Sequence, residues 1–549
     1  MPCCAAARRA VATRPRSDSI APGLKLGAFM KTIWLAAGAA LLAVPAAAQD
    51  MQHMSHADTA APKSPMILEG YGNGGFPITT SNPKAQAFFN NGMQLAHAFA
   101  HKAATEAMEE AVRLDPTCAM CLWGQAWASG PTINFGKSED EVADLAKLAD
   151  KAADLAKMNG TDRERSLIHA LQLRYKDGGG GKPGDLNFAK AMAALATQYP
   201  QDNEIAVIAA DAWLITKADN AEEYKLNARL AMPLLEGVLK RNPDDTPAIH
   251  FYIHATEQAG VPALAEPYAD RLAALAPRAS HLVHMPSHTY YWVGRYEDAA
   301  KTNMRAVELG IENAKRLGLG PPDGVWGLPY HSHNVTFGLG GALEAGDADI
   351  ALKLGRPLVV RSQAKDAAPP YAQMIAANGY YAMARFADSA EVLALPEPKL
   401  PFLQAAWHYA RGEAFARRND VAAVRKEAAA IHGISGELNK DDGSLQAQTM
   451  TYIARNVLNG RAAMMEHRPA EAAVAFAEAA ELQESDDFSS VADPPAWHYP
   501  VRRDLADALL QDGDLAGARK EAQAALKYRP RDPGTVALLS RLETRTAAR

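Results

Sequence analysis

Aromatic residues and long apolar runs are scarce in this chain. Aromatic side chains make up 7% of its 549 residues, and valine and isoleucine are also sparse, whereas alanine is abundant. This balance favours helices, because alanine loses no side-chain entropy when it enters one. After the first 48 residues no stretch is apolar enough to cross a bilayer, so we expect no transmembrane segment in the mature chain.

The chain also lacks the short motifs that mark several large enzyme classes. It contains no P-loop, no convincing dinucleotide fingerprint, no G-x-S-x-G elbow and no H-E-x-x-H. The pair Cys118-x-x-Cys121 is not a haem motif, because Leu122 stands where histidine is required. We therefore expect no nucleotide and no haem. The net charge is −6 and no basic block occurs, which disfavours a nucleic-acid partner.

Residues 1–48 have the pattern of an export leader. Met30-Lys31 begins a short basic start, an apolar run follows over 32–44, and three alanines at 46–48 form a cleavage pattern. We interpret this segment as a mis-called start plus a secretory signal peptide that is cleaved after Ala48. The expected location is periplasmic or secreted. Cleavage would change the net charge from −6 to −11, since the segment carries six Lys or Arg and one Asp.

Two of the four cysteines, Cys118 and Cys121, would remain after cleavage. They follow Asp115-Pro116 at the start of a predicted helix. In an oxidising compartment they are free to form a disulfide. A redox pair or half of a metal site are the alternatives, because a helix N-terminus lowers the pKa of a thiol.

Residues 49–80 form a flexible, polar lead-in, which carries the soft metal ligands Met51, His53, Met54 and His56. After it, small residues recur at fixed positions of a 34-residue unit. In the first unit Gly92, Ala104, Ala111 and Pro116 stand at positions 8, 20, 27 and 32. A middle unit has Ser287, Gly294, Ala299 and Ala306 at positions 8, 15, 20 and 27. The last unit has small residues at those four positions and proline at 32: Ala506, Gly513, Ala518, Ala525 and Pro530.

These positions resemble the tetratricopeptide repeat family over most of residues 83–545. The resemblance implies an all-α fold, an α-solenoid of helix pairs that forms a right-handed superhelix, with the first helix of each pair lining a concave face. We divide the array into N-terminal and central repeats at 81–350, which carry a histidine-rich concave site, and C-terminal repeats at 351–549.

Seven of the sixteen histidines lie within residues 250–333. His250 and His254 stand at positions 5 and 9 of one repeat, and His284 and His288 stand at the same positions of the next. In peptide-binding members of the family that the chain resembles, positions 2, 5, 9 and 12 face the groove. Positions 2 and 12 add four more candidates: Glu257, His281, Tyr291 and His333.

The histidine pattern predicts a transition-metal site for zinc, copper or iron, because imidazole is the commonest nitrogen ligand of these ions. We expect the four paired histidines to converge on one pocket, with the other four candidates around its rim. Pro286 should place His281 on a bent turn before the regular helix. A metal-free groove for an anionic or peptide ligand, and simple structural packing, are the alternatives. A further pair, His97 and His101, falls across an inter-helix turn and is interpreted as structural.

The favoured function is an exported solenoid that binds a peptide, protein or small-molecule ligand in its groove through the metal. One alternative is a zinc hydrolase or an iron or copper oxidase, in which Glu257 or Tyr291 supplies acid–base chemistry. A metal-free scaffold for peptides or proteins is the other. The segments HFYIH, HLVHMPSHTYYWVGRY and DPTCAMCLWG also resemble exported bacterial tetratricopeptide proteins with a histidine-rich centre, and this resemblance implies export but no particular reaction.

Overall fold

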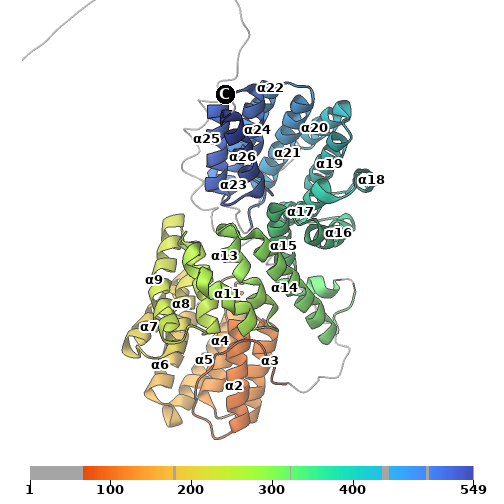
Figure 1. The fold of residues 1–549 in the computed structure, drawn as a ribbon. Helices are drawn as coiled ribbons and strands as arrows, with labels where there is room; N and C mark the ends of the chain where they lie inside the picture. The colour runs from red at the N-terminus through yellow and green to blue at the C-terminus, as the bar shows by residue number, and fades with distance from the viewer. Residues whose placement is uncertain (1–65, 177–180, 322, 436–443, 490–493, 548–549) are drawn as a thin grey trace, which may run out of the picture. The chain divides into compact units, whose positions relative to one another are not determined.

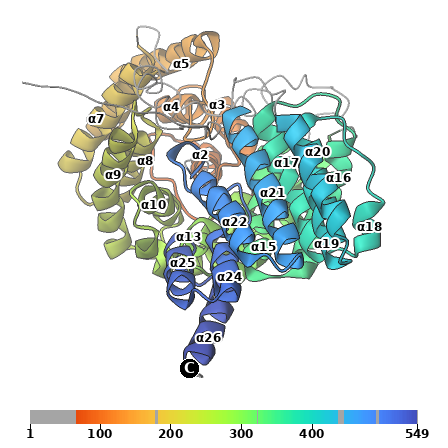
Figure 2. The ribbon, with the colours of Figure 1, turned by 90° about the horizontal axis from the view of Figure 1, so that it is seen from above.

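The computed structural model describes residues 66–176, 181–321, 323–435, 444–489 and 494–547. The regular elements in these ranges are helices, and no strand occurs among them (Figures 1 and 2). The prediction of an all-α fold is therefore confirmed. None of the described helices combines the length and the apolar character that a bilayer crossing needs.

Three sequence predictions fall outside the described residues. They concern the leader over 1–48, its cleavage after Ala48, and the Met/His-rich segment at 51–56. The end of the lead-in is described, and it is bonded to the repeats. The Leu68 amide donates to Asn91 Oδ1 at 2.9 Å, and the Asn73 amide donates to Thr246 Oγ1 at 2.8 Å.

The helices of the first half lead up to and include the histidine-rich segment. They are α2 (Pro83–His97), α3 (His101–Leu114), α4 (Ala119–Ala128), α5 (Glu139–Asn159), α6 (Asp162–Tyr175), α7 (Lys182–Gln198), α8 (Asn203–Ile215), α9 (Ala221–Arg241), α10 (Thr246–Gln258), α11 (Glu266–Leu275), α12 (Ser280–His284), α13 (Pro286–Trp292), α14 (Tyr296–Arg316), α15 (His331–Ala345) and α16 (Ala348–Gln363).

The helices of the second half continue the array to the C-terminus. They are α17 (Pro370–Phe386), α18 (Ser389–Leu393), α19 (Pro401–Arg417), α20 (Val421–Ser435), α21 (Ser444–Met465), α22 (Pro469–Gln483), α23 (Asp486–Ser489), α24 (Arg502–Asp512), α25 (Leu515–Tyr528) and α26 (Pro533–Ala547).

Most of the described helices pack against the next one along the chain, and several also contact the next but one, as α2 does with α4 and α19 with α21. The small residues of the repeat permit this close packing. At Gly92, position 8 of the first unit, a Cβ atom would lie 2.7 Å from the Met108 side chain of α3. The helix pairs are thus held by apolar contacts between neighbours, as in other repeat arrays.

Position 15 of the repeat ends the first helix of a pair in the left-handed conformation. Gly260, Gly294, Gly346 and Gly513 have φ between +76° and +95°, a region that glycine enters without a Cβ clash. In the first unit this position is occupied by Phe99, with φ 54°. A bulky residue held there costs about 1 kcal/mol.

Two of these glycines form a matched pair for a stability test. Gly260 has open space where a Cβ would lie, so Gly260→Ala should cost about 1 kcal/mol of unfolding free energy from backbone strain alone. A Cβ at Gly294 would also clash with the Pro530 carbonyl, so Gly294→Ala should cost about 2–4 kcal/mol. Urea unfolding of both variants measures the difference. Equal losses would contradict the close approach at Pro530.

The turn after α25 contacts helices far earlier in the sequence. The Tyr296 hydroxyl donates to the Pro530 carbonyl at 2.8 Å, across a separation of 234 residues. Arg529 Nε donates to Glu344 Oε1 of α15 at 3.1 Å, and both side chains are buried. The last described repeat is therefore joined to the central ones by one buried and one partly buried polar bond as well as by its own neighbours.

Candidate metal centre

Four central helices carry the candidate histidines. α10 presents His250 and His254, and its start is fixed by Asp245, whose carboxylate accepts from the Ala248 amide at 3.1 Å. The next repeat begins with two short helices, α12 and α13, because Pro286 lacks an amide donor. Met285 between them keeps α-helical angles, φ −51° and ψ −37°. α12 carries His281 and His284, α13 carries His288, and α15 carries His333.

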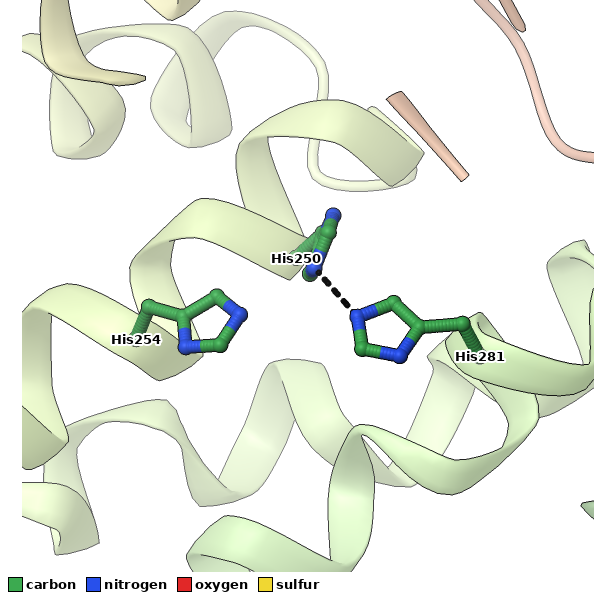
Figure 3. Close-up of side chains that lie close together, drawn as sticks. All are labelled: His250, His254 and His281. Atoms are coloured by element: carbon green, nitrogen blue, oxygen red, sulfur yellow. Dashed lines mark hydrogen bonds between the residues drawn. The ribbon is translucent and has the colours of Figure 1, made fainter. Parts of the chain in front are cut away.

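The first histidine group consists of His250, His254 and His281 (Figure 3). Each offers one ring nitrogen, and these three atoms lie within 4.8 Å of one another. The Nε2 atoms of His250 and His281 are 3.2 Å apart. His250 Nδ1–H donates to the His97 carbonyl at 2.7 Å, which leaves His250 Nε2 with its lone pair directed at His281.

The second histidine group consists of His284, His288 and His333, again with one nitrogen each within 4.8 Å of the others. The Nε2 atoms of His284 and His288 are 3.0 Å apart. The Nδ1 atom of His284 lies 2.6 Å from Asn303 Oδ1, and that of His288 lies 2.8 Å from Glu257 Oε2.

The hydrogen bonds of this second group fix which nitrogen carries a proton. Asn303 Nδ2 donates to the Ala299 carbonyl at 2.8 Å, so its oxygen faces His284 and accepts from Nδ1–H. The Glu257 carboxylate accepts from His288 Nδ1–H in the same way, while Trp292 Nε1–H donates to its other oxygen. In these tautomers the Nε2 atoms of His284 and His288 face each other, and a ring nitrogen without a proton is the form that can bind a metal ion.

Burial and mutual proximity lower the pKa of five imidazoles of the cluster: His250, His254, His281, His284 and His333. Desolvation is the largest cause, followed by repulsion from the neighbouring histidines. It lowers the pKa of His250 and of His333 to about 3, and it lowers the pKa of His254, His281 and His284 well below the usual 6.5. At neutral pH these rings are uncharged, which is the form that binds a metal ion.

The grouping differs in part from the single pocket that the repeat spacing suggested. The four paired histidines divide between two groups, and His281 and His333 are members of them instead of rim residues. Glu257 lies behind His288 and belongs to neither group. Tyr291 points to a different network, where its hydroxyl donates to Glu344 Oε1 at 3.2 Å. The six rings are also more deeply buried than a groove surface would leave them: only His333 is more than 8% exposed.

Aromatic rings that the sequence did not single out complete the surroundings. The Phe99 ring stacks on His281 at 4.8 Å between centroids and meets the edge of His250 at 4.6 Å. Tyr330 lies 4.4 Å from His281, and Phe337 lies 4.3 Å from His288. The one sequence signal for Phe99 was its place at position 15, where a glycine was expected.

A cavity of about 160 Å³ opens beside the first group. The cavity makes the otherwise buried cluster accessible to a ligand at His281. Its lining combines apolar residues, among them Phe99, Leu317 and Tyr330, with polar and charged ones, among them Lys102, His281 and His331.

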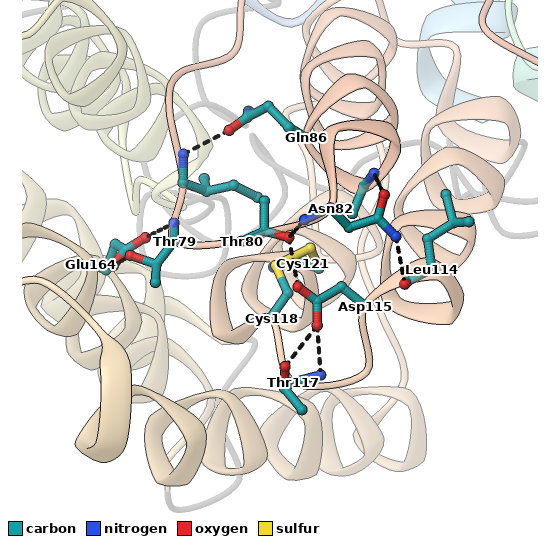
Figure 4. Close-up of a disulfide and its surroundings, with 12 residues drawn as sticks. Thr79, Thr80, Asn82, Gln86, Leu114, Asp115, Thr117, Cys118, Cys121 and Glu164 are labelled. Carbon is teal, nitrogen blue, oxygen red and sulfur yellow. Dashed lines mark hydrogen bonds between the residues drawn. A yellow bond between two sulfur atoms is a disulfide. The ribbon is translucent and has the colours of Figure 1, made fainter.

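Cys118 and Cys121 form a disulfide at the start of α4 (Figure 4). Cys118 is also the helix cap, since its sulfur accepts from the Cys121 amide at 3.0 Å. Asp115 holds the preceding turn by accepting from the hydroxyls of Thr80 and Thr117 at 2.6 and 2.7 Å. The two cysteines are 1% and 0% exposed, and thiol exchange needs access to a sulfur. Of the three alternatives, the geometry favours a structural disulfide.

Comparisons with known proteins give low similarity. No family model and no curated protein matches the chain. Among solved structures, the human IFIT1 dimer with m7Gppp-AAAA is 12% identical, with 82% of this chain and 91% of that chain covered and a TM-score of 0.30. Yeast Tom70 is 12% identical, with 85% and 90% covered and a TM-score of 0.26. The structure itself shows consecutive paired helices, with small residues and left-handed glycines at the predicted repeat positions.

Proposed function

We propose that this chain binds transition-metal ions in its two histidine groups. The observation that carries the proposal is the presence of two largely buried groups of three histidines, in each of which three ring nitrogens lie within 4.8 Å of one another. A metal ion can bind all three nitrogens of a group at once.

The spacing of the facing nitrogens supports the proposal. An ion bound by imidazoles at about 2.0–2.1 Å in tetrahedral or trigonal geometry separates its ligand nitrogens by about 3.3–3.5 Å. The Nε2 pairs, at 3.0 and 3.2 Å, need to open by only a few tenths of an ångström. A third nitrogen in each group completes a three-histidine site that keeps one position open.

The outer hydrogen bonds also support a metal. Metal-binding histidines usually donate their other N–H to a carbonyl or a carboxylate, which orients the ring and fixes its tautomer. Three of the six histidines have such an acceptor: His250, His284 and His288. Histidines that serve only for packing would not need such outer acceptors in two adjacent groups.

The role of the metal in the cell is part of the same proposal. An array of helix pairs is a common scaffold for a protein, peptide or small-molecule partner, and an open coordination position would let the metal contact that partner. Export through the expected leader would expose the protein to metal ions outside the cytoplasm. Because Tyr291 is buried against Glu344, we assign it no part in acid–base chemistry.

Elemental analysis of the protein purified from the periplasm without a histidine tag tests the proposal. We expect two ions per chain, either as isolated or after reconstitution with zinc and copper salts. A chain that stays metal-free after reconstitution would defeat the proposal and leave a plain scaffold. Recovery of the chain from the periplasmic fraction, beginning at Gln49, would test the leader in the same preparation.

Glu257→Gln tests the second group alone. Loss of the carboxylate removes the charged acceptor of His288 Nδ1–H, so we expect metal affinity of that group to fall about 10–100-fold. The first group, bonded to the His97 carbonyl, should keep its affinity. Glu266→Gln is the matched control, because Glu266 bonds to Arg295 outside the centre. Competition with a coloured chelator measures both affinities, and equal values for the two variants would contradict the outer-bond argument.

A further inference from the structure

We infer that the cavity beside the first histidine group binds a small aromatic carboxylate. The inference goes beyond the metal-binding proposal and does not depend on it, because the cavity has aromatic, polar and charged residues of its own. Four features carry it: the volume of the cavity, a wall of aromatic rings, a buried ring nitrogen without a partner, and charged side chains at the mouth.

The cavity has a volume of about 160 Å³ and lies between segments that are distant in the sequence. Its lining comes mainly from the turn between α2 and α3, from α3 and α12, from the C-terminal half of α14, and from the segment that leads into α15. A volume of about 10–15 Å³ is enough for one water molecule, so this cavity has room for a much larger molecule.

Aromatic rings form one wall of the cavity. The rings of Phe99 and Tyr330 lie 5.9 Å apart between centroids and are inclined by 26°, and the His281 ring lies 4.8 and 4.4 Å from them. The Tyr330 ring is held at its hydroxyl, which accepts from Asn134 Nδ2 at 3.3 Å and lies 3.1 Å from His101 Nε2. Rings fixed in this way favour a planar aromatic ligand, which can stack on them or meet their edges.

Phe99 keeps its place in this wall at a cost in backbone strain. Its φ is 54°, in the left-handed region where Gly260, Gly294 and Gly346 stand at the equivalent position of other repeats. A bulky residue stays in that region only where its surroundings hold it there, and such residues gather at binding sites. The first repeat thus has, in place of the usual glycine, a strained ring that lines the cavity.

A buried nitrogen without a partner belongs to the same lining. His331 is 4% exposed, and its Nδ1 atom has no hydrogen-bond partner among the described residues. Gly310 of α14 leaves space beside this atom, since a Cβ there would lie 3.1 Å from His331 Nδ1. Buried polar atoms almost always have a partner, so an unpaired one in a cavity points to a bound molecule. A ligand hydroxyl suits this nitrogen in either tautomer, because a hydroxyl both donates and accepts.

Charged side chains stand at the mouth of the cavity, where its lining is exposed. Lys102 and Glu106 lie one turn apart on α3, and Arg316 lies at the end of α14. Glu106 would repel an anion that approached Lys102, so the favoured place for a carboxylate is beside Arg316. A guanidinium can hold a carboxylate by two parallel hydrogen bonds. The ligand can therefore place its ring against the inner wall and its charge at the mouth.

Isothermal titration calorimetry of the untagged chain tests the inference. The probes are benzoate, para-hydroxybenzoate, phenol, benzylamine and acetate. We expect one benzoate per chain, with tighter binding of para-hydroxybenzoate because its hydroxyl reaches His331. Benzylamine has the ring with the opposite charge, and acetate has the charge without the ring. Both should therefore bind about tenfold more weakly than benzoate.

Variants at the mouth test where the carboxylate lies. Arg316→Met should weaken benzoate binding several-fold and leave phenol binding unchanged, because phenol has no carboxylate. Lys315→Met is the matched control: Lys315 is an exposed neighbour on α14 that does not line the cavity, so benzoate binding should stay as it is in the unchanged chain. Glu106→Gln removes the repelling charge and should strengthen benzoate binding.

Variants in the interior test the placement of the ring. His331→Phe keeps a ring and removes the nitrogen, so it should cancel the advantage of para-hydroxybenzoate over benzoate. Gly310→Ala adds a methyl group beside His331 and should weaken all the aromatic probes. Gly237→Ala on α9 is its matched control, because a Cβ there makes only an ordinary contact, 3.6 Å from Arg241. Circular dichroism checks that each variant keeps its helices.

The same titration, repeated after removal of metal with a chelator, separates this inference from the metal-binding proposal. Benzoate binding that persists without metal supports the cavity, whether or not the chain takes up ions. Binding that is lost with the metal would place the carboxylate on an ion and overturn the inference. Absence of benzoate binding, equal binding of benzoate and benzylamine, or equal losses in Arg316→Met and Lys315→Met would also overturn it.

Discussion

Simultaneous replacement of His254 and His288 by alanine should abolish metal binding and leave the helical content unchanged. Each histidine belongs to a different group, so each single variant loses one ion and the double variant loses both. Two remaining imidazoles per group would bind an ion far more weakly than three. The helices should persist, because neighbour packing at small residues such as Gly92 holds them.

The measurement pairs elemental analysis with far-ultraviolet circular dichroism of the same samples. His169→Ala on α6, an exposed histidine outside both groups, is the matched control and should retain two ions. A double variant with a full complement of metal would mean that the ligands lie elsewhere. Loss of helical signal in the double variant, with retention in both singles, would instead assign the histidines a structural role.

Glu344→Ala should destabilise the protein by about 3–5 kcal/mol, because it leaves the Arg529 guanidinium buried without its partner. Each of the two residues is only 1% exposed. The Glu344 carboxyl also accepts from the Tyr291 hydroxyl, so that bond is lost as well. Urea unfolding measures the change in the free energy of unfolding.

The Glu344→Gln variant separates the effect of the side chain's shape on stability from the effect of its charge. Burial raises the pKa of Glu344 to about 7, against the opposing pull of Arg529. The folded protein thus keeps a proton that the unfolded chain releases near pH 4.5, so the stability contributed by this group is full below about pH 4.5 and is lost as the pH rises through 7. Glutamine should weaken this pH dependence and cost much less than alanine. An alanine variant as stable as the glutamine variant would show that the pair contributes little.

The repeat architecture was predictable from the sequence because it depends on local rules. Small residues at positions 8, 20 and 27 and glycine at position 15 act within a single helix pair, and one chain shows many copies of them. The contact of Arg529 with Glu344 was not predictable in this way, because its residues are 185 positions apart and belong to different repeats. Arg529 and Glu344 do not stand at positions that the repeat pattern marks.

The candidate histidines were predictable from their register, but their grouping was not. Equal repeat positions place His250 and His284 on equivalent turns, yet the neighbour of His250 in the structure is His281 of the next repeat. The outer partners were missed for a similar reason. Asn303 lies on α14 and the His97 carbonyl at the end of α2, and neither follows from a spacing within α10 or α13.

The contacts of Tyr296 and Arg529 also decide how the chain would respond to mechanical force. A linear helical array that is pulled at its ends unravels pair by pair at low force, since each pair is held by its neighbours alone. Here the turn at 529–530 is anchored to α14 and α15, more than 180 residues earlier. Tension applied through the C-terminus would therefore reach the central repeats directly, and the intervening pairs would carry little load until this anchor broke.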